Sequence, residues 1–78
     1  MNLKIKGIYK HYKGKFYIIE DIAINSETME KMVVYRALYD DNQLWVRPYN
    51  MFVEKVCKNG QTYRFELCDL QSKCKDII

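Results

Sequence analysis

Residues 33–48, Val-Val-Tyr-Arg-Ala-Leu-Tyr-Asp-Asp-Asn-Gln-Leu-Trp-Val-Arg-Pro, decide the fold of this 78-residue chain. β-Branched and aromatic side chains are frequent over Met32–Tyr39 and again over Leu44–Arg47, and each run predicts a strand. Between the runs, Asp40–Gln43 predicts a turn, because Asp and Asn side chains bond readily to their own backbone. Pro48 ends the second strand, since proline has no N–H to give to the ladder. The stretch therefore predicts an antiparallel β-hairpin.

Two further hairpins are expected, one on each side of this one. The expected strand pairs are residues 7–12 with 15–24, and residues 53–57 with 62–67. Gly14 supplies the positive φ of the first turn, and Asn59-Gly60 occupies the turn of the other. Between the second and third hairpins, Asn50–Phe52 is expected to form one helical turn, in which Met51 and Phe52 plug one end of the core.

Five or six short strands joined by tight turns give an all-β fold class, a small antiparallel barrel or sandwich. We expect one domain over residues 1–67 and a C-terminal tail over residues 68–78. No run approaches the roughly 18 apolar residues of a membrane span, and no long apolar segment follows the N-terminal charges. These features predict a cytoplasmic protein with no membrane partner.

The cysteines are Cys57, Cys68 and Cys74, and their odd number excludes a complete internal disulfide framework. Their spacing differs from that of paired zinc ligands. We therefore expect free thiols and no metal site, as is usual in a reducing compartment.

The formal net charge is +3, and the first fifteen residues hold five lysines and no acidic residue. Tyr9, His11 and Tyr12 lie among these lysines. A basic, aromatic stretch of this kind suits nucleic-acid binding. It equally suits an edge strand that lysines protect against aggregation.

The side chains that share a face depend on the register of each hairpin. A two-residue turn at Lys13-Gly14 places Tyr9 opposite Ile18 and His11 opposite Phe16, on one face. A turn centred on Asp41-Asn42 predicts a core face in the second hairpin. Its members are Tyr35, Ala37, Tyr39, Leu44 and Val46.

The same register places Arg36 opposite Arg47 on the other face of the second hairpin, with Trp45 beside them. Like charges directly opposite destabilise a strand pair. An anionic ligand would relieve the repulsion, and so would Glu20 or Asp21 from the neighbouring strand.

No catalytic constellation is recognisable. His11 is the only histidine, and no nucleophile or carboxylate partner can be assigned to it from the sequence. The adjacent pairs Glu20-Asp21 and Asp40-Asp41 are poor acid–base partners, because neighbouring strand residues point to opposite faces. We expect no enzymatic activity and no cofactor; an enzyme with His11 as general base is the remaining catalytic interpretation.

The ordered set of motifs resembles the bacterial family called domain of unknown function 1653, over about residues 7–65. The matching motifs are Tyr9–Gly14 followed by Tyr17, Ser26–Thr28, Val33–Tyr39, and Leu44–Pro48 with Met51-Phe52. Lys15 stands where a second glycine is usual, and Asp41 departs from the usual glycine-bearing turn. The resemblance implies a compact SH3-like domain and brings no activity or functional residue with it.

The expected function is that of a non-catalytic binding module for a peptide, a protein or an anionic ligand. The candidate ligand-binding residues are Arg36, Trp45 and Arg47, extended by Tyr9 and His11. Small barrels bind peptides through aromatic-lined grooves. The alternative is single-stranded nucleic acid, bound by the same residues with the N-terminal lysines.

Overall fold

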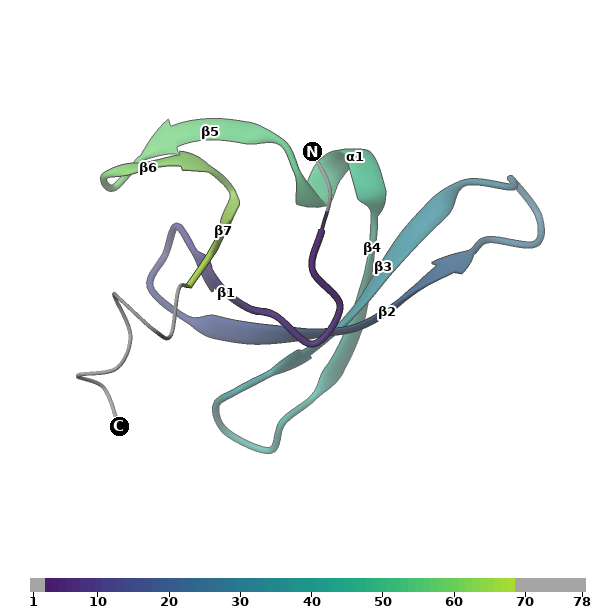
Figure 1. Cartoon of the computed structure of the whole chain (residues 1–78), viewed down its shortest axis with the longest axis horizontal. Helices are drawn as coiled ribbons and strands as arrows, with labels where there is room; N and C mark the ends of the chain where they lie inside the picture. The colour runs from purple at the N-terminus through teal and green to yellow at the C-terminus, as the bar shows by residue number, and fades with distance from the viewer. Residues whose placement is uncertain (1–2, 69–78) are drawn as a thin grey trace.

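The computed structural model describes residues 3–68, which form an all-β fold with one helical turn (Figure 1). The elements are β1 (Ile8–His11), β2 (Phe16–Ile24), β3 (Lys31–Ala37), β4 (Leu44–Pro48), α1 (Tyr49–Phe52), β5 (Lys55–Lys58), β6 (Gln61–Tyr63) and β7 (Phe65–Leu67). An antiparallel sheet holds five strands in the order β4-β3-β2-β1-β7, and β5 pairs with β6. The predicted all-β class is confirmed, but the described sheet ends at β4 and β7 and does not close into a barrel. The expected tail lies outside the described residues, apart from Cys68.

The first hairpin forms as predicted, but its register is shifted by one residue. Tyr9 pairs with Tyr17 and Ile8 with Ile18, so the predicted pairing of Tyr9 with Ile18 is wrong. The loop has three residues, because the N–H of His11 donates to the carbonyl of Lys15. Three-residue loops of this kind end in a residue with positive φ, and Gly14 has a φ of 104°.

The second hairpin also forms, with a register three residues away from the predicted one. Arg36 pairs with Leu44 and Val33 with Arg47, so the two arginines are not opposite each other. The cause is a longer loop, in which Asp40 and Asn42 both have positive φ. The Asn42 side chain holds the loop by donating to the carbonyl oxygen of Ala37 at 3.0 Å.

That odd shift exchanges the faces of β4 relative to β3. Val33, Tyr35 and Ala37 are buried on the face that we call the inner face, and Trp45 and Arg47 share it. The predicted core face is therefore wrong for β4. Its expected members Leu44 and Val46 lie on the outer face and are 42% and 61% exposed.

A bulge in β2 keeps the inner face apolar. Ile19 pairs with Tyr35 and Asp21 with Val34, so Glu20 is an extra residue in the strand. Two residues of a bulge oppose one residue of the partner strand. Ile19 and Ile22 thus both pack towards the core, although three positions separate them.

The core is mainly aromatic. α1 follows β4 directly (Figure 1) and contributes Phe52 to the core. Its buried members are Tyr9, Ile19, Val33, Tyr35, Phe52 and Phe65. The rings of Phe52 and Phe65 stack with their centroids 4.0 Å apart. The predicted plug is confirmed for Phe52, which is fully buried, whereas Met51 is 46% exposed.

The third hairpin turns at Asn59-Gly60, where φ is 52° and 81°, as a two-residue hairpin turn requires. The chain then leaves β6 at Arg64 and enters β7, which pairs with β1.

The expectation of three free thiols is wrong: Cys57 is free and exposed, but Cys68 is disulfide-bonded. Among the described residues, no helix is long and apolar enough to cross a membrane.

Replacing Phe52 with alanine should lower the free energy of unfolding by about 3–5 kcal/mol, because it leaves a cavity beside the stacked ring of Phe65. Met51→Ala, on the same helical turn, should change it by less than about 0.5 kcal/mol. Denaturant unfolding measures both. Equal losses for the two variants would contradict the assignment of Phe52 as the plug.

Candidate ligand-binding site

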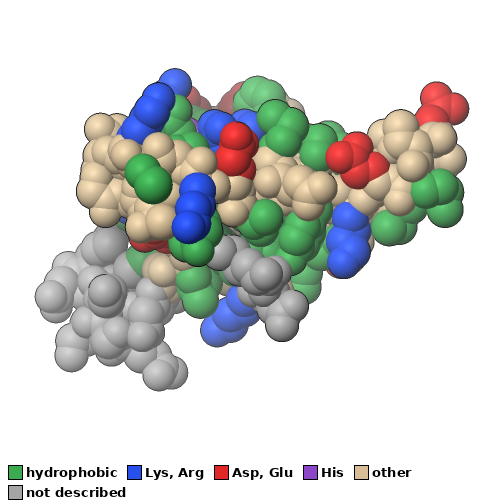
Figure 2. Space-filling model, turned by 90° about the horizontal axis from the view of Figure 1, so that it is seen from above, with side chains coloured by type: hydrophobic (Ala, Val, Ile, Leu, Met, Phe, Trp, Pro, Cys, Tyr) green, Lys and Arg blue, Asp and Glu red, His purple; other side chains and the backbone are tan. Residues whose placement is uncertain are grey.

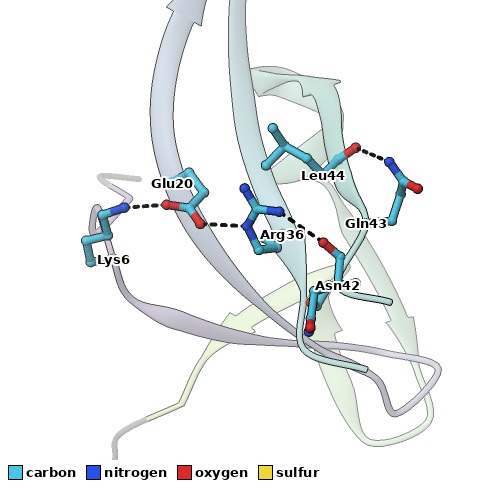
Figure 3. A network of polar contacts seen from close by, with 7 residues as sticks. Lys6, Glu20, Arg36, Asn42, Gln43 and Leu44 are labelled. Atoms are coloured by element: carbon cyan, nitrogen blue, oxygen red, sulfur yellow. Dashed lines mark hydrogen bonds and ion pairs between the residues drawn. The ribbon is translucent and has the colours of Figure 1, made fainter. Parts of the chain in front are cut away.

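The structure separates the predicted arginine pair onto opposite faces of the sheet. Arg36 is on the outer face, where its Nε donates to Glu20 Oε2 at 3.0 Å and its Nη1 donates to the carbonyl of Asn42 at 3.0 Å (Figure 3). Lys6 contacts the other oxygen of Glu20. Glu20 and Asp21 are the two acids expected to neutralise Arg36, and Glu20 is the one that does so. Asp21 accepts a backbone N–H from Ile22 instead.

The Glu20 network is an electrostatic support for the sheet rather than an open site. Hydrogen bonds from Lys6 and Arg36 lower the pKa of the Glu20 carboxyl below its ordinary value of 4.5. Because Arg36 is already ion-paired, it offers little attraction to an added anion. Arg36 is thus engaged by Glu20 and by the Asn42 carbonyl, on the face opposite to Trp45 and Arg47.

Trp45 and Arg47 lie together on the inner face and line a hollow of about 160 Å³. We call this hollow the aromatic cradle; its residues are Tyr17, Tyr35, Tyr39, Trp45 and Arg47. A second hollow of about 290 Å³ shares Tyr39 and Trp45 with it and extends along the β3–β4 loop. Asp40 and Asp41 line this second hollow, which we call the loop hollow.

Three tyrosines build the floor of the cradle. The ring centroid of Tyr17 is 5.3 Å from that of Tyr35 and 5.5 Å from that of Tyr39, in edge-to-face contacts. The hydroxyl oxygens of Tyr17 and Tyr39 are 2.7 Å apart. Burial and this hydrogen bond raise the pKa of Tyr17, so its hydroxyl stays neutral. The floor is thus both apolar and able to donate hydrogen bonds.

Arg47 is the cation of the cradle. Its Nε donates to the Tyr35 hydroxyl at 3.3 Å, and its guanidinium carbon lies 5.9 Å from the ring centroid of Phe65. Within residues 3–68, no carboxylate lies within ion-pair distance of Arg47. Arg36 and Arg64 each pair with a glutamate, so Arg47 is distinguished from them by its unneutralised charge.

The rim of the cradle carries a second cation and an exposed ring. Lys15 Nζ lies 4.7 Å from the ring centroid of Tyr39. Trp45 is 49% exposed although it is paired with the buried Tyr35. A large aromatic side chain left half in water beside a cation is a surface suited to contacts with a ligand.

The other two expected site residues, Tyr9 and His11, lie in different surroundings. Tyr9 is buried in the core, where its hydroxyl accepts the N–H of Lys4 at 2.9 Å, so it is unavailable to a ligand. His11 lies beside the cradle, with its ring centroid 6.4 Å from that of Tyr17 and 4.9 Å from that of Phe65.

The environment of His11 favours the neutral ring. Its Nδ1 accepts the backbone N–H of Lys13 at 3.1 Å. Burial, followed by the charges of Arg64, Arg47 and Lys13, lowers the pKa of His11 below 6.5. The positive potential that lowers this pKa also attracts anions to the same face.

Sequence reasoning missed Tyr17, Tyr35 and Tyr39 as site residues, having assigned the last two to the core. With the observed register, the alternation of side chains along β3 and β4 would have placed Tyr35 beside Trp45. The contribution of Tyr17 depends on the register of both its strand pairs, with β1 and with β3. No local motif in the chain indicates it.

Comparisons with known proteins identify a family without a described activity. The profile of the family "Protein of unknown function (DUF1653)" matches residues 7–67. A crystal structure of a DUF1653 protein from Bordetella bronchiseptica is similar, with 31% sequence identity and a TM-score of 0.71. The alignment covers 82% of this chain and 85% of that one. No curated protein matches this sequence.

Glu20→Gln should make stability less dependent on pH. In the wild type, the ion pairs of Glu20 contribute fully above pH 4.5, and the contribution is lost as the pH falls through the lowered pKa of the folded state. The difference in unfolding free energy between wild type and Glu20→Gln should therefore be largest near neutral pH and should shrink below pH 4.5. Denaturant titrations across this range measure it.

Glu27→Gln is the control, because the Glu27 carboxylate makes no ion pair within residues 3–68. A stability difference for Glu20→Gln that stays constant from neutral to acid pH would show that the charge of the Glu20 carboxylate does not stabilise the fold.

Proposed function

This chain belongs to the DUF1653 family, and we propose that it is a non-catalytic, SH3-like binding module whose aromatic cradle binds an extended peptide segment carrying a carboxylate. The observation that carries the proposal is Arg47, a cation on an aromatic floor with no carboxylate partner within residues 3–68. A carboxylate that approaches Arg47 gains a charge-assisted hydrogen bond, which is stronger than a neutral one.

The volume of the cradle favours a side chain over a whole small molecule. Ligand pockets for small molecules commonly measure about 300–1,000 Å³. The cradle and the loop hollow measure about 160 and 290 Å³, and they meet at Tyr39 and Trp45. Two adjoining hollows of this size suit successive side chains of a peptide, with Trp45 between them.

The charges of the two hollows also favour a peptide over nucleic acid. Arg47 and Lys15 attract an anion at the cradle, whereas Asp40 and Asp41 in the loop hollow repel one. On the face shown in Figure 2, basic and acidic side chains are interspersed rather than gathered into a basic groove. Among the N-terminal lysines, Lys6 is paired with Glu20 on the outer face.

Single-stranded nucleic acid remains the alternative ligand, since Lys15 and Arg47 both lie beside exposed aromatic surface.

A cytoplasmic location remains part of the proposal. Reducing conditions there would open the disulfide of Cys68.

Arg47→Gln should weaken the binding of peptides selected from a random peptide display library by about tenfold or more, since hydrogen bonds to charged groups contribute about 1.5–3 kcal/mol. Arg36→Gln is the matched control and should change the dissociation constant by less than about twofold, because Arg36 is engaged by Glu20. Fluorescence anisotropy with labelled peptides measures both variants, after denaturant unfolding has shown that each is folded.

Equal effects of the two arginine variants would remove the cradle as the binding site. Oligothymidylate serves as the competing probe. If it binds instead of peptides, with affinity that falls steeply with salt concentration, the module binds nucleic acid and the peptide proposal is wrong.

A further inference from the structure

β4 lies at one edge of the five-stranded sheet and leaves apolar side chains in water on both of its faces. Within residues 3–68 it pairs with β3 alone. Trp45 on the inner face is 49% exposed, and Leu44 and Val46 on the outer face are 42% and 61% exposed. An open edge with exposed apolar side chains is a template for pairing with a further strand.

One hydrogen bond shows which backbone groups of β4 point away from β3, towards the open edge. The N–H of Ala37 donates to the carbonyl of Gln43, so the backbone carbonyl of Gln43 points towards β3. In an antiparallel pair, hydrogen-bonded and non-hydrogen-bonded positions alternate. Trp45 and Arg47 therefore also bond towards β3, whereas Leu44, Val46 and Pro48 present their backbone groups to the edge.

These outward groups are not equivalent. The Leu44 carbonyl accepts a hydrogen bond from the side chain of Gln43 at 3.5 Å (Figure 3), and Pro48 has no N–H. Val46 presents both its N–H and its carbonyl. The centre of the free edge is thus Val46, and the two ends are partly blocked.

Natural proteins protect open edges with charged side chains, prolines, bulges or very short strands. β7, at the other edge, has three residues. β4 has five residues; its one charged side chain, Arg47, bonds to Tyr35 on the inner face, and its proline is the last residue of the strand. The sheet bulge is in β2, not in β4. The edge of β4 is therefore protected least at Val46.

We propose that β4 pairs antiparallel with β4 of a second copy of this chain, about a twofold axis at Val46. This pairing places Val46 opposite Val46, where two N–H to carbonyl hydrogen bonds form across the axis. It places Trp45 of each copy opposite Arg47 of the other on the inner face. Leu44 of each copy lies opposite Pro48, whose carbonyl can accept the Leu44 N–H.

The sequence of β4 selects a second copy over an unrelated strand. Trp45 and Arg47 flank Val46 symmetrically, so an antiparallel pair about Val46 matches an aromatic ring with a guanidinium twice. A parallel pair, or an antiparallel pair about another residue, loses this match. The positive charge of Arg47 that no described carboxylate neutralises is then shared with an aromatic ring of the other copy.

The pairing is tested by the concentration dependence of mass, with the full chain carrying Cys57→Ser so that a disulfide at the exposed Cys57 cannot link two copies. Sedimentation or light scattering should show a monomer–dimer equilibrium. Over the same concentration range, hydrogen exchange of the Val46 amide should slow, because its N–H faces solvent in the monomer and is bonded in the dimer.

Val46→Lys places a charge at the axis and should raise the concentration of half-dimerisation at least tenfold. Ile24→Lys is the control; Ile24 is 54% exposed on β2 and should leave dimerisation unchanged. Val46 does not line the cradle, so peptide binding by the Val46→Lys monomer is expected to persist and tests the proposed function separately.

A Cys57→Ser chain, otherwise unchanged, that stays monomeric at millimolar concentration overturns the proposal. So does a dimer that Val46→Lys leaves intact, or a Val46 amide that is protected equally at all concentrations, since another segment would then cover the edge. Thermal unfolding establishes that both lysine variants are folded. An unfolded Val46→Lys is replaced by Val46→Thr, for which a smaller loss of dimer in the same direction is expected.

Discussion

The register between β3 and β4 is the constraint on which the inner face depends. It is fixed at one end by the loop that Asn42 closes onto the Ala37 carbonyl, and at the other by α1, which follows β4 directly. Within these limits Arg47 comes to lie diagonally beside Tyr35 and bonds to its hydroxyl. A shift by a single residue would exchange Trp45 and Arg47 for Leu44 and Val46 and would leave the inner face without its cation.

The core and the candidate site are parts of one aromatic assembly. Phe65 stacks on Phe52 in the core and is 5.5 Å, centroid to centroid, from Tyr35, which the cradle shares. Close packing of this kind holds side chains in single rotamers. The tyrosines of the cradle are therefore placed by the same contacts that stabilise the fold, and a ligand would meet a surface that is already formed.

Sequence patterns predicted the first two hairpins, the turn residues Gly14 and Asn59-Gly60, and the burial of Phe52. They extended the third hairpin over residues 65–67, which instead form β7 and pair with β1. They did not predict the registers of the first two hairpins, because loop length depends on contacts such as that of Asn42 with Ala37, which pair preferences do not contain. Each observed register differs from the predicted one by an odd number of residues, so each error exchanged the two faces of a strand. For this reason Trp45 and Arg47 were recognised as candidates while their true neighbours on the inner face were not.

The position of Trp45 also determines what the intrinsic fluorescence of this protein reports. Trp45 is the only tryptophan of the chain, and it is half in water where the cradle and the loop hollow meet on the edge strand β4. Its indole senses the surface rather than the packed interior. The emission of this chain thus responds to a change at that surface more directly than to a change around Tyr9, which is buried in the core and outside the cradle.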